Sequence, residues 1–238
     1  MKKYEFTDET IHKPNGPRRM VLHRIRALVD IPFRGIKAGQ LGGFIEKEDN
    51  LSHDGNAWVG GNAIVCDNAV VKDNALVTDN AKLTNNCKVY GNAEIMDRAE
   101  LSHRCDVSGS AKIYGYSVLQ GAAKVYGNAL VYGNAAISGN SEIFGNARIF
   151  GSAHTQYDCK VDGNNSIVWI DNLGPNWETM TFYACADGTM KMSYMWFSGT
   201  LDEFIVWVNN NKTYATYNAN NDNVLFDAII LARKKLKL

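Results

Sequence analysis

The chain has 238 residues, with 25 basic and 25 acidic side chains and therefore a formal net charge of zero. This balance argues against bulk nucleic-acid binding and against an acidic mimic of DNA. No segment approaches 18 consecutive apolar residues, and five cysteines without a C-x-x-C pair fit neither a disulfide framework nor a zinc site. We therefore expect a cytoplasmic protein in a reducing compartment, with no membrane association and no metal.

Residues 1–54 are predicted to form a small N-terminal β cap. Two strand-like pieces, KKYEFT and RMVLHRIRALV, flank the turn-rich HKPNGPRR. We expect this segment to cover the open first coil of the repeats that follow. Apolar side chains predicted to point outward in the first repeats should lie beneath the cap; they are Trp58, Ile64, Val70 and Leu76.

Residues 55–168 carry a six-residue repeat. Every sixth position from Ala57 to Cys159 is a small residue, and the position two residues later is aliphatic in every repeat but one, where it is Thr155. Because alternate side chains of a strand share a face, both positions point inward. Three repeats make a triangular coil of 18 residues, so the sequence predicts a mainly β protein with a parallel β-helix of about six coils.

Residues 18 apart should then lie directly above one another on the outer surface. One such column alternates in charge from its second member onward: Val70, Lys88, Asp106, Lys124, Glu142 and Lys160. Aromatic side chains should stack in a column that contains Tyr114, Tyr132 and Phe150, and Tyr126 should stack beneath Phe144. We expect the face formed by Tyr114, Leu130, Tyr132 and Phe150 to be an interface, although these residues could also simply cover β surface.

The turns between repeats pair Gly or Asp with Asn, residues that tolerate a positive φ. In five successive repeats the Asn position is occupied by other residues, namely Arg98, Arg104, Ser110, Tyr116 and Ala122. We predict that Arg98, His103, Arg104 and Tyr116 bind a phosphate-bearing ligand or an acidic partner surface. The alternative is sequence drift at exposed corners, with His103 serving only as a turn residue.

Residues 169–238 should form a C-terminal α/β module. Two strand-like runs, WETMTFYACA and TMKMSYMWF, are joined near Asp187 and Gly188, which favour a hairpin. Thr200 and Glu203 are typical of a capping box that begins a helix, and a second helix is expected from about Asn220 to Lys235. This module should dock on the last coil or on a partner.

The unit [LIV]-x-[GD]-N-A-x resembles the hexapeptide repeat of left-handed parallel β-helices, such as acyltransferases and gamma-type carbonic anhydrases. The chain also resembles the YdcK-type β-solenoid proteins of phages and prophages. This resemblance rests on the repeated triplet Gly-Asn-Ala and on the segments LHRIRAL, KAGQLGGFIEKEDNLS and WFSGTLDEFIVWV. The first resemblance implies a left-handed coil and a trimer, although a dimer through the end module is an alternative. The second implies a phage setting but no activity.

Acyltransferases of this type place a catalytic His near a loop that interrupts the coils, and no such loop interrupts these repeats. A gamma-type carbonic anhydrase needs His ligands from adjacent coils, but His103 and His154 are 51 residues apart, which is not a multiple of 18. Cys87, Cys105 and Cys159 share one corner as buried small residues. The sequence thus assigns no catalytic residue, no metal and no cofactor.

Three functions remain open. We expect a noncatalytic homo-oligomeric interaction protein that binds a protein partner, such as a host metabolic enzyme or defence complex. The alternatives are a hexapeptide-repeat acyltransferase and an oligomer that binds or sequesters a small ligand between subunits.

Overall fold

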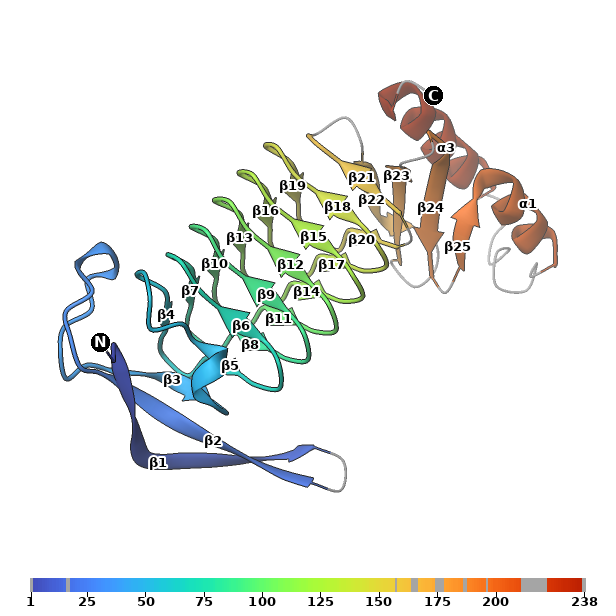
Figure 1. The fold of residues 1–238 in the computed structure, drawn as a ribbon. Helices are drawn as coiled ribbons and strands as arrows, with labels where there is room; N and C mark the ends of the chain where they lie inside the picture. The colour runs from blue at the N-terminus through green and yellow to red at the C-terminus, as the bar shows by residue number, and fades with distance from the viewer. Residues whose placement is uncertain are drawn as a thin grey trace.

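The computed structural model describes residues 2–15, 18–156, 158–163, 167–173, 178–185, 188–195, 197–210 and 222–236. N-terminal strands lead into a parallel β-solenoid of about six coils, and a small module of strands and helices follows it (Figure 1). This arrangement confirms the predicted mainly β fold of stacked parallel coils. No helix in the described part of the chain is long and apolar enough to cross a membrane.

The solenoid consists of short strands in a regular series: β4 (Trp58–Val59), β5 (Ile64–Val65), β6 (Val70–Val71), β7 (Leu76–Val77), β8 (Lys82–Leu83), β9 (Lys88–Val89), β10 (Glu94–Ile95), β11 (Glu100–Leu101), β12 (Asp106–Val107), β13 (Lys112–Ile113), β14 (Val118–Leu119), β15 (Lys124–Val125), β16 (Leu130–Val131), β17 (Ala136–Ile137), β18 (Glu142–Ile143), β19 (Arg148–Ile149), β20 (His154–Thr155) and β21 (Lys160–Val161). Every third strand belongs to the same face. We call the three faces the β4 face (β4-β7-β10-β13-β16-β19), the β5 face (β5-β8-β11-β14-β17-β20) and the β6 face (β6-β9-β12-β15-β18-β21).

Strands within a face pair in parallel, and each residue lies beside the residue 18 positions later, as in the pairing of Glu94 with Lys112. The small and aliphatic positions of the repeat point inward and form one continuous buried core. Two of the small positions are serines, and these remain satisfied because Ser117 and Ser141 each donate a hydrogen bond to the carbonyl three residues earlier, at 2.7 and 2.6 Å. The predicted inward and outward assignment is therefore confirmed.

The turns have the positive φ that the repeat predicts, and the Asp residues there have a second role. Asp79 and Asp97 adopt φ of 60° and 57°. The carboxylate of Asp79 accepts a hydrogen bond from the backbone N–H of Asp97 at 3.1 Å, and that of Asp97 accepts one from Gly115 at 2.9 Å. Each Asp thus links its turn to the turn of the next coil. Asn side chains form similar links, as between Asn74 and Asn92 at 3.0 Å.

The N-terminal segment contains β1 (Tyr4–Asn15), β2 (Arg18–Ala27), the 3₁₀ helix η1 (Pro32–Arg34), β3 (Leu41–Ile45) and the 3₁₀ helix η2 (Glu48–Asn50). β3 pairs in parallel with β5, so this segment continues the β5 face and covers the first coil as predicted (Figure 1). Trp58 and Ile64 are buried, and Val70 and Leu76 are half-buried. Ile64 packs against Leu22 and Phe44 of this segment.

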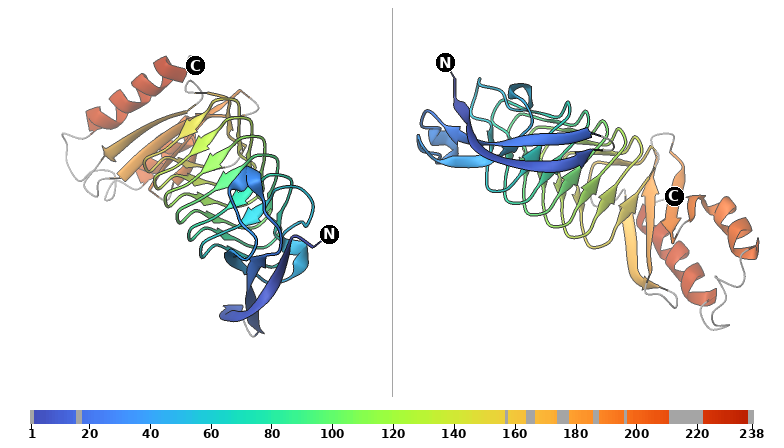
Figure 2. Two further views of the ribbon diagram at one scale, coloured as in Figure 1. Left: turned by 90° about the vertical axis from the view of Figure 1, so that its left-hand side faces the viewer. Right: turned by 90° about the horizontal axis from the view of Figure 1, so that it is seen from below.

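The prediction that all of HKPNGPRR forms a turn is wrong, because both flanking strands extend into it. β1 continues through Asn15 and β2 begins at Arg18, so that Lys13 pairs with Met20 and Pro14 with Arg19. The two strands form a long hairpin that lies alongside the first coils (Figure 2). Pro14 is tolerated because β1 is the edge strand of its sheet.

The C-terminal module contains β22 (Ile167–Leu173), β23 (Glu178–Ala184), β24 (Met190–Tyr194), β25 (Phe197–Thr200), α1 (Leu201–Asn210) and α3 (Asp222–Leu236). Its four strands form an antiparallel sheet in sequence order. β22 was not expected from the sequence, and the predicted boundary at residue 168 falls within it. The predicted hairpin joins β23 and β24, although Asp187 lies outside the described residues.

The run TMKMSYMWF was expected to be one strand, and this is wrong. The chain turns at Met195, where φ is 53°, and Tyr194 of β24 pairs with Phe197 of β25. No Gly, Asn or Asp marks this turn, which explains why the sequence did not reveal it. The capping box is confirmed, because the Glu203 carboxylate accepts hydrogen bonds from both the N–H and the hydroxyl of Thr200, at 2.7 and 3.0 Å.

The module packs directly on the last coil. The N–H of His154 donates to Thr181 Oγ1 at 3.1 Å, and Ser193 Oγ donates to the carbonyl of His154 at 2.9 Å. Cys159 and Cys185 pair in an isolated antiparallel bridge, and the buried Tyr183 belongs to the solenoid core. A separate core beneath the helices includes Phe182. The last open coil is therefore covered, as the first is.

Candidate interaction face and end groove

Three aromatic rings form a column on the β4 face. Tyr114, Tyr132 and Phe150 follow strands β13, β16 and β19, and the 18-residue register places each ring above the one before. The ring centroids of Tyr114 and Tyr132 are 5.1 Å apart with planes at 3°, and those of Tyr132 and Phe150 are 5.1 Å apart with planes at 10°. The predicted stack is confirmed, while its role as an interface stays a prediction.

The fourth predicted interface residue, Leu130, lies in the neighbouring outward column. It pairs in register between Lys112 and Arg148 and is half-buried. Burial, followed by the nearby Tyr132, raises the pKa of the Tyr114 hydroxyl above its usual value. The side chains of the neighbouring column, Lys112, Leu130 and Arg148, are basic or aliphatic.

Trp169 of β22 completes the column at its C-terminal end. Its ring meets Phe150 edge-on, with centroids 4.5 Å apart and planes at 86°. An edge-to-face contact is a favourable arrangement for aromatic rings. The repeat does not indicate this residue, because β22 lies beyond the repeats and Trp169 is offset by one position from the 18-residue column that ends at Phe150.

The opposite end of the β4 face is partly covered by the N-terminal segment. Arg34 of η1 donates to Glu94 at 3.1 Å, and Lys112 bonds the other oxygen of the same carboxylate at 2.7 Å. Farther along the face, toward the C-terminal module, Phe150 is 38% exposed. The column thus occupies the stretch of the β4 face between the N-terminal contact and the C-terminal module.

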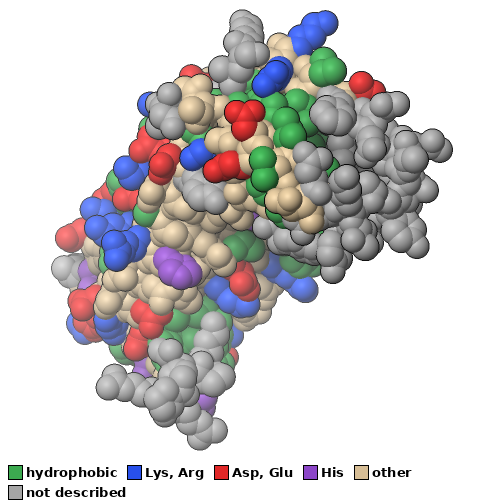
Figure 3. Space-filling view, turned by 90° about the vertical axis from the view of Figure 1, so that its right-hand side faces the viewer, with side chains coloured by type: hydrophobic (Ala, Val, Ile, Leu, Met, Phe, Trp, Pro, Cys, Tyr) green, Lys and Arg blue, Asp and Glu red, His purple; other side chains and the backbone are tan. Residues whose placement is uncertain are grey.

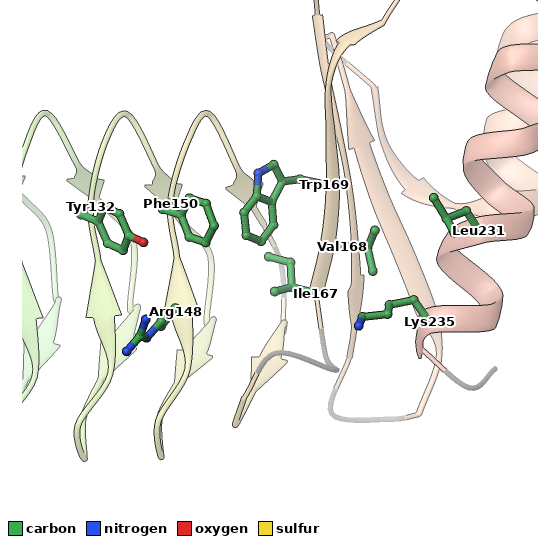
Figure 4. A pocket seen from close by; sticks show the side chains of 8 residues that line it. All are labelled: Tyr132, Arg148, Phe150, Ile167, Val168, Trp169, Leu231 and Lys235. Carbon is green, nitrogen blue, oxygen red and sulfur yellow. The ribbon is translucent and has the colours of Figure 1, made fainter.

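A groove of about 530 Å³ lies where the β4 face meets the C-terminal module. Figure 4 shows the rings of Tyr132, Phe150 and Trp169 in a row, with Leu231 and Lys235 extending from α3 beyond β22. The described residues that line it are Tyr132, Arg148, Phe150, Ile167, Val168, Trp169, Leu231 and Lys235. Aromatic and aliphatic side chains form most of the surface, and two cations are the charged members of this set.

Helix α3 adds exposed apolar area close to these cations. Ile230 and Leu231 are 64% and 55% exposed, and the last turn contains Arg233, Lys234 and Lys235. In the end view of Figure 3, hydrophobic side chains lie next to Lys and Arg side chains along the upper edge of the molecule. An exposed apolar surface of this kind is typical of a binding site.

The predicted binding residues Arg98, His103, Arg104 and Tyr116 are not all brought together. The Arg98 guanidinium lies over the Tyr116 ring, 5.4 Å from its centroid, at a corner that also contains Asp79 and Asp97. His103 and Arg104 occupy the next corner, on the other side of β11. His103 has φ of 70°, and its N–H donates to Asn85 Oδ1 at 3.0 Å. A ligand at Arg98 and Tyr116 stays a prediction.

The cysteines occupy the positions that the repeat predicts, with Cys87, Cys105 and Cys159 buried on the β6 side of the core. Burial raises the pKa of the Cys159 thiol, and a hydrogen bond to Cys87 together with burial raises that of Cys105. Such thiols react slowly, because the thiolate is the nucleophile. Among the described residues, no group of three or more His, Cys, Asp or Glu side chains is placed to hold a metal ion.

No protein-family model matches the sequence, and a search of curated proteins finds no significantly similar sequence.

Proposed function

We propose that this protein is a noncatalytic β-solenoid interaction protein that binds a macromolecular partner through the β4 face and the C-terminal module. The observation that carries this proposal is the aromatic column of Tyr114, Tyr132 and Phe150, which continues through Trp169 into the end groove. Aromatic residues at the centre of an exposed apolar surface are typical of protein interfaces.

The regular coils support a scaffold function. Strands β4–β21 follow one another at six-residue spacing, and both ends of the solenoid are covered by other parts of the chain. Because the stacked coils share one continuous core, the outward columns are held in fixed positions. A rigid array of outward side chains suits recognition of a large partner surface.

The resemblance to YdcK-type proteins supports a phage- or prophage-encoded protein that acts in the cytoplasm. A host enzyme or a defence complex is then the proposed partner. Self-association through the β4 face belongs to the same proposal, with a trimer or a dimer as the expected form.

Capture from host lysate, with variants of two different faces, tests this function. Tyr132→Asp with Phe150→Asp places two carboxylates in the column and should abolish both partner capture and self-association. The matched control is Tyr126→Asp with Phe144→Asp, because these rings form a similar stack on the β6 face, with centroids 5.2 Å apart.

The proposal is supported if one defined protein is captured by the wild-type chain and by the control, but not by the β4-face variant. Equal capture by all three chains would contradict it. Acetylation of small amines by the purified protein with acetyl-CoA would favour the acyltransferase alternative instead.

A further inference from the structure

The end groove combines apolar surface with positive charge. Phe150 and Leu231 face it from the last coils and from α3, and both are substantially exposed. Trp169 lies between them and is held edge-on against Phe150. An apolar side chain that enters the groove would therefore contact preformed aromatic surface.

The two cations of the groove have no anionic partner within the described part of the chain. Arg148 and Lys235 are exposed, and neither forms an ion pair there, whereas Lys82, Lys112 and Lys124 on the solenoid each pair with a Glu. Asp171 of β22 does not line the groove, and its carboxylate accepts a hydrogen bond from Thr179 at 2.6 Å. The groove is thus positively charged.

We infer that the end groove binds an acidic segment of a partner protein that carries a leucine or aromatic side chain beside its carboxylates. This inference rests on the proposed function and names the chemistry of the partner. Arg148 can bond a carboxylate with two parallel N–H donors, and Lys235 supplies a second charge from the opposite side of Trp169. The apolar side chain would lie between Phe150 and Leu231.

Charge should determine which peptides bind. A basic segment would be repelled by Arg148 and Lys235, and a neutral one would leave both cations without a counterion.

A second copy of this chain also offers acidic and apolar side chains together, since α1 presents Asp202 and Glu203 near the exposed Val206. The experiment therefore has to separate a partner peptide from self-association.

The probe is a fluorescently labelled acidic peptide, DELFDLLE, titrated with the full-length protein and followed by fluorescence anisotropy. Its neutral counterpart, NQLFNLLQ, has the same shape without the carboxylates. We expect the acidic peptide to bind at least tenfold more tightly and to weaken as salt rises. Arg148→Glu and Lys235→Glu should each weaken it at least tenfold, whereas Lys234→Glu, one residue away on α3 and not a lining residue, should have a much smaller effect.

Three results of the peptide titrations would overturn the inference. They are equal binding of the two peptides, binding that Arg148→Glu and Lys235→Glu leave unchanged, and no detectable binding of the acidic peptide at millimolar protein. Light scattering tests whether a second copy of this chain fills the groove instead. If the protein forms an oligomer that excludes the peptide and that dissociates in Arg148→Glu, the groove binds a second copy and the assignment to a partner protein is overturned. If the peptide fails while the Tyr132 and Phe150 variant still loses its captured protein, only this inference fails and the proposed function stands.

Discussion

Arg34 and Glu94 are 60 residues apart in sequence, and their side chains meet at 3.1 Å on the β4 face. The side chain of Arg34 is only 9% exposed and that of Glu94 21%, so the pair is largely shielded from water. Arg34 also donates to the carbonyl of Asn74. One side chain thus attaches η1 to two successive coils.

We predict that Arg34→Ala lowers the free energy of unfolding by about 2–4 kcal/mol, because it leaves a shielded carboxylate and a carbonyl without this donor. Chemical denaturation measures the change. Arg26→Ala is the control, since Arg26 and Glu5 are 49% and 39% exposed and such surface pairs contribute about 0–1 kcal/mol. Equal losses in the two variants would show that Arg34 is not a specific attachment.

The turn carboxylates give a second prediction. Asp97 combines a positive φ with a hydrogen bond to the N–H of Gly115 in the next coil. Asp97→Ala loses the bond and puts alanine, which tolerates a positive φ less well than aspartate, in the turn, so it should cost about 1–3 kcal/mol. Asp97→Asn keeps the acceptor and tolerates the same φ, and should stay close to wild type. Thermal unfolding of both variants tests this order, and a more stable Ala variant would contradict it.

His154 gives a pH dependence to the junction between the solenoid and the C-terminal module. Burial lowers the pKa of its imidazole below the usual value of 6.5. As pH falls below about 6.5, the unfolded chain binds a proton that the folded chain does not, so stability should decrease over this window. The carboxylates whose pKa is lowered, such as that of Glu94, lose their contribution to folding stability only as the pH falls below about 4.5.

Melting temperatures between pH 5 and 7.5 measure this effect. We expect a decline toward pH 5 in the wild type and a flatter profile in His154→Gln, because Gln does not titrate. The same slope in both proteins would assign the decline to other groups.

The repeat predicted those features that depend on local spacing. The small and aliphatic positions, the single column of alternating charge and the stack of Tyr132 on Phe150 all follow from the six-residue and 18-residue periods. Features that depend on contacts between distant segments were not predicted, as with Arg34 on Glu94 and Trp169 against Phe150. No period connects such residues.

Turn chemistry explains the remaining differences. Met195 adopts a positive φ that its residue type does not suggest, so the turn between β24 and β25 could not be predicted from residue types. For Asp97, the sequence predicted the positive φ of the turn but not the hydrogen bond that its carboxylate accepts from the next coil. The end groove needs both α3 and the last coils, so no single segment indicated it.

The last prediction concerns Lys88 and Val89, which are consecutive in β9 and point to opposite sides of the coil. Val89 is fully buried among the aliphatic positions, and Lys88 is exposed beside Val70 and Asp106 in its column. Val89→Asp places an unpaired charge in the core, where the penalty is several kcal/mol, so the variant should unfold or lose most of its stability. Lys88→Gln should change the free energy of unfolding by no more than about 0.5 kcal/mol. Circular dichroism followed by thermal melting separates the two outcomes, and near-equal melting temperatures would show that the inward and outward positions of the repeat are wrongly assigned.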